Sequence, residues 1–160
     1  LLENITHLMS PSEFEYIVER ARSSKIIDMS VSDRPEPRVS EQELRAFEIQ
    51  LGVSLPADFR HFAQRYGCGG LAFITVLSLL PESEFFIGCS THLVSPGFLP
   101  VIDNHCGDFY GFRITDGRCS DALYFADHEQ SYELSDTEYP DFFSFVVREG
   151  LGTGETQQPN

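Results

Sequence analysis

The sequence predicts an α+β fold in which an antiparallel, mostly meandering β-sheet packs against N-terminal helices and one C-terminal helix. Three observations predict it. Helical periodicity marks three stretches between residues 10 and 66. Strand-like patterns occur between residues 71 and 127, and helical periodicity returns near residue 140. Segregation of helices from strands favours α+β over an alternating α/β fold. With 160 residues and 41% hydrophobic content, the chain suits one domain around one core.

Two capping boxes, Ser10–Glu13 and Ser40–Glu43, predict the first two helices, because a Ser hydroxyl and a Glu carboxylate can each accept a backbone N–H there. Their predicted inner faces are Phe14, Ile17, Val18 and Ala21 in the first helix and Leu44, Phe47 and Leu51 in the second. Gly52 ends the second helix. Between the two helices, Pro35 and Pro37 predict an exposed loop over residues 28–40.

A third helix begins at Leu55-Pro56 and ends at the glycines of Gly67–Gly70. Its predicted inner face is Phe59, Phe62, Ala63 and Tyr66. Phosphate-binding loops run from a strand into a helix, whose N-terminal amides hold the anion. This glycine cluster runs from a helix into a strand, so it predicts a helix end and a turn, and no nucleotide site.

The second half predicts strands and a final helix. We expect one strand over 71–80, a mostly irregular segment over 82–97 whose Phe85 and Phe86 anchor in apolar surroundings, and a closing meander. The meander strands are 98–103, 108–114 and 121–127, with turns at Asn104–Gly107 and Thr115–Arg118. The final helix has Pro140 near its first turn and an inner face of Phe142, Phe145 and Val146. Residues 151–160 form a flexible tail.

The net charge of the chain restricts the classes of molecule that it can bind. The formal net charge is −14, and residues 81–160 carry 3 Lys or Arg against 14 Asp or Glu. This charge predicts no direct binding to nucleic acid or to an anionic membrane. No apolar run is long enough to cross a bilayer, and the first ten residues lack the pattern of a secretory signal. Four widely spaced cysteines favour reduced thiols and a cytoplasmic location.

The stretch LPVIDNHCGDFYGFRI sets Asp103, His105, Cys106 and Asp108 close together. Neighbours on an extended chain point to opposite faces, so His105 and Cys106 would not meet as a nucleophile and its base. Asp and Asn beside Gly are typical of turns. Cys and His lack paired metal-ligand spacing. We therefore predict no enzyme activity, metal or cofactor, and keep as an alternative a hydrolase built on Cys106 or on the Asp103–Asp108 pair.

Three stretches together resemble the SUKH superfamily. They are LGVSLPADFRHFAQRYGCGG, FLPVIDNHCGDFYGF and EYPDFFSFVVREG, and the resemblance spans residues 40–150. The chain departs from the superfamily pattern in having Cys68-Gly69-Gly70 where Asn-Gly-Gly is frequent, and in having no Trp. The sequence also predicts that residues 1–39, which contain a helix and a Pro-containing loop, form one globular unit with the 40–150 domain.

The superfamily includes a yeast cell-wall synthesis regulator and many bacterial immunity proteins. The resemblance implies a non-enzymatic immunity protein that neutralises a bacterial toxin, of nuclease type, by covering its basic active site. A regulatory scaffold like the yeast member is the alternative, and the oligomeric state stays open. The acids expected to bind the partner are Asp103, Asp108, Asp116, Asp121, Asp127, Glu129, Glu133 and Asp136.

Overall fold

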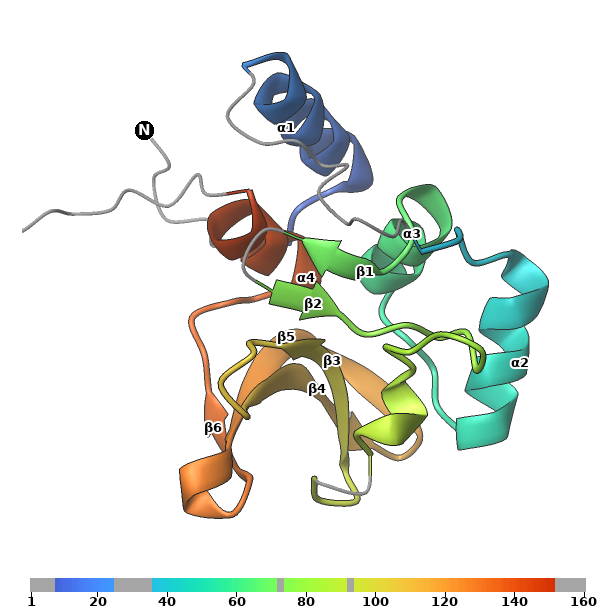
Figure 1. The fold of residues 1–160 in the computed structure, drawn as a ribbon, viewed down its shortest axis with the longest axis vertical. Coiled ribbons are helices and arrows are strands. Elements are labelled where there is room, and N and C mark those ends of the chain that lie inside the picture. Colours follow the sequence, from blue (N-terminus) through green and yellow to red (C-terminus); the bar gives the residue numbers. More distant parts are fainter. Residues whose placement is uncertain (1–7, 25–35, 72–73, 92–93, 152–160) are drawn as a thin grey trace, which may run out of the picture.

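The computed structural model describes residues 8–24, 36–71, 74–91 and 94–151 and confirms the α+β fold. Its six-stranded sheet is antiparallel throughout, and the strands lie side by side in chain order (Figure 1). The strands are β1 (Gly69–Leu71), β2 (Ile74–Val76), β3 (Phe98–Asp103), β4 (Phe109–Thr115), β5 (Arg118–Asp127) and β6 (Glu133–Asp136). The sheet is therefore a meander, as the sequence predicts.

The predicted helices are present. They are α1 (Pro11–Ser23), α2 (Glu41–Leu51), α3 (Ala57–Arg65) and α4 (Phe142–Phe145), and α4 continues as a single π turn over Val146–Gly150. Both predicted capping boxes form, and Gly52 ends α2 with a φ of 66°. Leu51 is the exception, because it is 42% exposed and does not belong to the inner face of α2.

Three other features differ from the sequence prediction. Residues 71–80 contain the end of β1 and the short strand β2 in place of one strand. The strand β6 was not predicted, because its sequence ELSD is polar and only its pairing with β5 identifies it. Of the predicted exposed loop, 28–35 lies outside the described residues, and Val39 is buried with its N–H donating to the Ala63 carbonyl. Residues 152–160 also lie outside, whereas Leu151 is buried.

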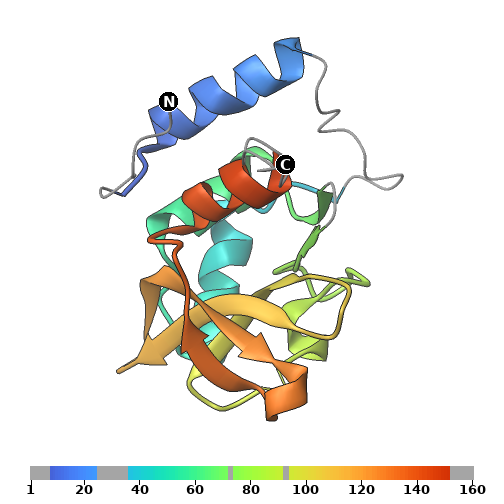
Figure 2. The same ribbon diagram turned by 90° about the vertical axis from the view of Figure 1, so that its left-hand side faces the viewer.

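The helices α3 and α4 lie between the sheet and α1, which forms the outermost layer (Figure 2). A column of buried phenylalanine rings connects these layers. Phe112 of β4 contacts Phe59 of α3 with ring centroids 5.7 Å apart, and Phe59 contacts Phe142 of α4 at 5.0 Å. Phe14 of α1 stacks on Phe143 at 4.1 Å. The helix α1 is thus packed into the core that the sheet and the other helices share.

Two carboxylates, the half-buried Asp58 and the buried Asp141, hold the start of α4. Oδ2 of Asp58 accepts the Phe142 N–H at 2.7 Å, and Oδ1 of Asp141 accepts the Ser144 N–H at 2.7 Å. The other Asp141 oxygen accepts the Met9 N–H at 2.6 Å, just before α1. Burial raises the pKa of Asp58 to about 6, the Asp141 charge adds to the rise, and the backbone N–H donors oppose it. These carboxylates tie α1, α3 and α4 together.

Truncating Phe14 tests the packing of α1. We expect Phe14→Ala to lower the free energy of unfolding by about 3–5 kcal/mol, because the ring is fully buried between Phe143 and Phe62. Urea unfolding measures the change. Tyr16→Ala is the matched control on the same helix, since Tyr16 is 63% exposed and its loss should change stability little. Equal effects of the two substitutions would contradict this packing.

The raised pKa of Asp58 predicts a pH dependence of stability. Because the folded protein binds this proton near pH 6 and the unfolded chain binds it only near pH 4, the Asp58 contribution to stability falls as the pH rises from about 4 to about 6. Relative to Asp58→Asn, the wild type should gain about 2 kcal/mol of unfolding free energy between pH 7 and pH 4.5. Urea unfolding at both pH values measures the gain. A difference in unfolding free energy between wild type and Asp58→Asn that is the same at both pH values would refute the prediction.

Candidate functional site

The register of the sheet gathers acidic side chains at one end. Asp103 pairs with Phe109, Phe109 pairs with Ala126, and Asp127 pairs with Glu133, so the same end of four strands carries carboxylates. A short 3₁₀ turn over His128–Gln130 connects β5 to β6 at this end (Figure 1). We call this group the acidic end, and its members are Asp103, Asp108, Asp127, Glu129 and Glu133.

The β3–β4 turn is held by its own side chains. Oδ1 of Asp103 accepts the His105 N–H at 2.7 Å, and Oδ1 of Asn104 accepts the N–H groups of Cys106 and Asp108 at 2.9 and 3.2 Å. His105 and Gly107 have positive φ angles of 62° and 96°, which such a tight turn requires. The turn predicted from Asp and Asn beside Gly is therefore confirmed.

Asp108 and His128 connect this turn to the β5–β6 connection. Nδ1 of His128 lies 2.6 Å from Oδ1 of Asp108, and the His128 backbone N–H donates to the same oxygen at 3.0 Å. Asn104 donates to the other oxygen at 3.0 Å. The hydrogen bond to Asp108 raises the pKa of His128 above its ordinary value. Burial pushes the Asp108 pKa up, but the hydrogen bonds from His128 and Asn104 outweigh it and hold that pKa low.

Sequence reasoning did not identify His128 or Asn104 as parts of this site. His128 is 20 residues from Asp108, and only the pairing of β4 with β5 brings the two together. The available signal was the triplet Asp127-His128-Glu129 directly after a predicted strand, because such a position lies at a sheet end. Asp127 caps this connection, since its Oδ1 accepts the Glu129 N–H at 2.8 Å.

Asp108, Asp127 and His128 also have potential metal-ligand atoms within 4.8 Å of one another. Two of these three groups already bond each other, because His128 Nδ1 and Asp108 Oδ1 form the short contact described above. Asp108 also accepts hydrogen bonds from the Asn104 side-chain amide and from the His128 backbone N–H. The hydrogen bonds of Asp108 and His128 therefore already join the two turns to each other.

The alternative of a hydrolase at Cys106 has no support in the geometry. Cys106 is exposed, and Nε2 of His105 lies 3.1 Å from Oγ1 of Thr75. Asp103 and Asp108 accept hydrogen bonds from different donors. Burial raises the pKa of the Cys68 and Cys119 thiols to about 12, which keeps them protonated and unreactive at neutral pH. In the part of the chain that the structure describes, no hydrogen bond connects a histidine or a carboxylate to the Cys106 thiol.

The other three predicted acids lie elsewhere on the sheet. Asp136 pairs with Tyr124, three residues along β5 from Asp127. Asp121 lies farther along β5, on the order of 20 Å from Asp127 at the usual rise per residue of a strand. Asp116 occupies the β4–β5 turn with a φ of 50°. Five of the eight acids therefore make up the acidic end, Asp116 and Asp121 lie toward the opposite end, and Asp136 lies between them.

Little positive charge offsets the acidic end. Residues 119–147 contain seven Asp or Glu and no Lys or Arg. The guanidinium of Arg113 in β4 lies over the Tyr124 ring at 4.3 Å. Arg60 of α3 pairs with Glu41 and Glu48 of α2. Arg60 is thus neutralised locally, and the acidic end keeps an excess of negative charge.

These features define a small α+β domain with a rigid charged surface, which is the architecture of a protein-interaction domain. The model of the SMI1 / KNR4 family (SUKH-1) matches residues 38–147. The chain belongs to this family, which confirms the resemblance to the SUKH superfamily. Membership supports binding to a protein partner.

A solved structure has the same fold. It is a crystal structure of a protein from Pseudomonas syringae pv. tomato, with 14% sequence identity and a TM-score of 0.65. The similarity covers 87% of this chain and 99% of that one. At this identity the likeness concerns the fold alone. No curated protein matches the chain. Among the described residues, no helix has the length and apolar character needed to cross a membrane.

The Asp108–His128 contact predicts how His128 titrates. Because the folded-state pKa of His128 is raised, the pair stabilises the fold below about pH 6.5 and loses this contribution as the pH rises through the folded pKa. Asp108→Asn should therefore lower the pH at which His128 titrates, measured by NMR of its ring C–H groups. Asp103→Asn is the control, since Asp103 bonds the His105 N–H instead. A titration midpoint of His128 that is the same in Asp108→Asn and in the wild type would refute the role given to the Asp108–His128 contact.

Proposed function

We propose that this protein is a cytoplasmic immunity protein that neutralises a cognate bacterial toxin, of nuclease type, by covering its basic active site with the acidic end. The observation that carries the proposal is the acidic end itself, combined with membership of the SMI1 / KNR4 family. A nuclease must attract phosphate, so its active site presents positive charge. Carboxylates that enter such a site occupy the positions of the nucleic-acid phosphates.

Rigidity of the acidic end supports this function. The Asp103–Asp108 turn and the Asp127–Glu133 connection are hydrogen-bonded within themselves and to each other through His128. A surface that is already ordered loses little conformational entropy on binding. Glu129 and Glu133 are exposed at its outer edge, where they can meet a partner's Lys or Arg. Long-range attraction then raises the association rate.

The proposed protein performs no chemistry itself, and α1 belongs to its folded unit. Support for the first statement is the contact of the His105 ring with Thr75, since Nε2 of His105 lies 3.1 Å from Oγ1 of Thr75. Support for the second is the Phe14–Phe143 stack and the Met9–Asp141 hydrogen bond. A regulatory scaffold like the yeast member remains the second candidate, and the acidic end would serve it as well. The two differ in the partner, which is a toxin in one case and a signalling or cell-wall protein in the other.

Neutralising charge at the acidic end should slow association with the toxin. We expect Glu129→Gln with Glu133→Gln to lower the association rate constant by about tenfold at low salt, with a smaller effect at high salt. Surface plasmon resonance with the cognate toxin domain measures both rates. Asp116→Asn with Asp121→Asn is the matched control, because it changes the net charge equally at the other end of the sheet. An equal effect of the two pairs would refute the acidic end as the binding surface.

Co-expression distinguishes the two candidate functions. An immunity protein should restore growth to cells that produce the cognate toxin domain, and the Glu129 and Glu133 pair of substitutions should weaken this protection. A toxin that kills equally with and without the wild-type chain would overturn the immunity function. The scaffold would then be favoured.

A further inference from the structure

Strand β6 (Glu133–Asp136) leaves one edge of the sheet open. It is the last strand in the order β1 to β6 and pairs with β5 alone (Figure 1). Among the described residues, its backbone forms no hydrogen bond to any element other than β5. In an antiparallel pair, alternate N–H and C=O groups of each strand point away from the partner. Those of β6 form an edge that can accept a further strand, which we call the β6 edge.

The opposite edge of the sheet is partly covered by the chain itself. A Cβ added at Gly69, the first residue of β1, would lie 2.8 Å from Cγ of Glu36, so the segment ahead of α2 packs against the start of this strand. At β6, three of the four residues are exposed and only Leu134 is half-buried. An exposed edge strand is a template for pairing with another chain.

The side chains of the β6 edge select the strand that can pair with it. Glu133 lies opposite Asp127 and Asp136 lies opposite Tyr124, and since the two acids are three residues apart, they point to opposite faces of the sheet. Within the described part of the chain, neither carboxylate has an ion pair or a hydrogen bond. The β6 edge therefore presents negative charge on both faces.

The cations of the neighbouring elements do not neutralise this charge. Arg148 and His128 each contact another carboxylate, at 3.0 and 2.6 Å. Arg113 of β4 lies over the Tyr124 ring at 4.3 Å, and β4 is two strands, about 10 Å, from β6. Arg118 begins β5, six residues or about 20 Å along that strand from Tyr124.

Charge also argues against a second copy of this chain as the occupant. Two copies that pair through β6 would bring Glu133 and Asp136 of both chains to one seam, where like charges repel. Each copy carries a net charge of −14, which adds to the repulsion. The strand that complements this edge is a basic one.

We propose that the β6 edge docks an extended, basic strand of a protein partner, which adds to the sheet beside β6. Antiparallel pairing, which continues the pattern of the sheet, sets a cation opposite Asp136, an apolar residue opposite Leu134 and a second cation opposite Glu133. The two cations of the partner are thus three residues apart. The inference rests on the proposed function in identifying the partner with the toxin, which the acidic end attracts and the β6 edge orients.

The first test needs no toxin. The ¹⁵N-labelled protein is titrated with acetylated Thr-Lys-Thr-Val-Lys-Thr amide, in which the lysines are three residues apart. The control Thr-Lys-Val-Lys-Thr-Thr has the same composition but sets both lysines on one face of the strand. We expect saturable amide shifts at residues 133–136 with the first peptide and about fivefold weaker binding of the control. Equal binding of the two peptides, or no shift at β6, would overturn the proposal.

A second pair of peptides separates strand pairing from simple charge attraction. N-methylation of alternate residues removes the N–H groups along one edge of a strand, so the two possible alternations block opposite edges of the first peptide. We expect one alternation to keep its affinity for β6 and the other to lose it. Equal affinities of the two methylated peptides would overturn strand pairing.

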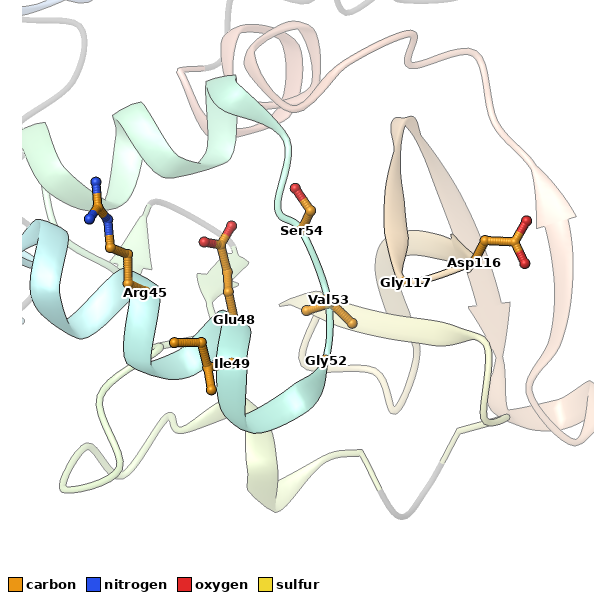
Figure 3. A pocket seen from close by; sticks show the side chains of 8 residues that line it. All are labelled: Arg45, Glu48, Ile49, Gly52, Val53, Ser54, Asp116 and Gly117. Carbon is orange, nitrogen blue, oxygen red and sulfur yellow. The ribbon is translucent and has the colours of Figure 1, made fainter.

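Substitutions in the protein test the charges of the edge. Glu133→Gln with Asp136→Asn should weaken binding of the first peptide by about fivefold. Asp116→Asn with Asp121→Asn is the matched control, because it changes the net charge equally toward the opposite end of the sheet. There Asp116 lines a shallow depression between the β4–β5 turn and the end of α2 (Figure 3). An equal effect of the two pairs would contradict docking at β6.

The last test uses the cognate toxin domain. Hydrogen–deuterium exchange of the amides of residues 133–136 should slow by about tenfold in the complex, because the added strand engages the outward N–H groups of β6. If the toxin domain does not bind, the proposed function fails and the peptide titrations still decide the β6 edge. If it binds and exchange at β6 is unchanged, the proposal for the β6 edge fails alone.

Discussion

The fold depends on the two carboxylates that hold the start of α4, Asp58 and Asp141. A helix of four residues followed by one π turn is too short to be stable by itself. Asp58 and Asp141 supply acceptors for its first N–H groups, and Asp141 also binds the backbone ahead of α1. They thereby fix Phe142 and Phe143, whose rings connect the sheet to the outer helix.

The same framework presents two unlike surfaces at the two ends of the sheet. At the acidic end, turn hydrogen bonds and the Asp108–His128 contact order the carboxylates before any partner arrives. Exposed charges of this kind add little to stability, so their concentration points to a role in recognition. Across the sheet, the close approach of Gly52 and Gly117 shapes a groove beside the exposed Ile49.

Local chemistry explains why most elements could be predicted. Ser and Glu three residues apart form the capping boxes, Gly52 adopts the left-handed conformation that ends α2, and apolar and aromatic runs between turn residues mark β3 to β5. Predictions were wrong where the outcome depended on distant residues. Strand β6 exists because β5 offers an edge to the polar Glu133–Asp136 segment, and Leu51 is exposed because the last turn of α2 extends past the core.

The sequence by itself determined the α+β class, the order of the helices and the main strands, the turn at Asn104–Gly107 and the excess of negative charge in the second half. Tertiary structure alone decided where that charge lies. Composition counts carboxylates but carries no distances, whereas strand register places Asp103, Asp108, Asp127 and Glu133 on one end and Asp116 on the other. For the same reason the contact between Asp108 and His128, 20 residues apart, follows only from the pairing of β4 with β5.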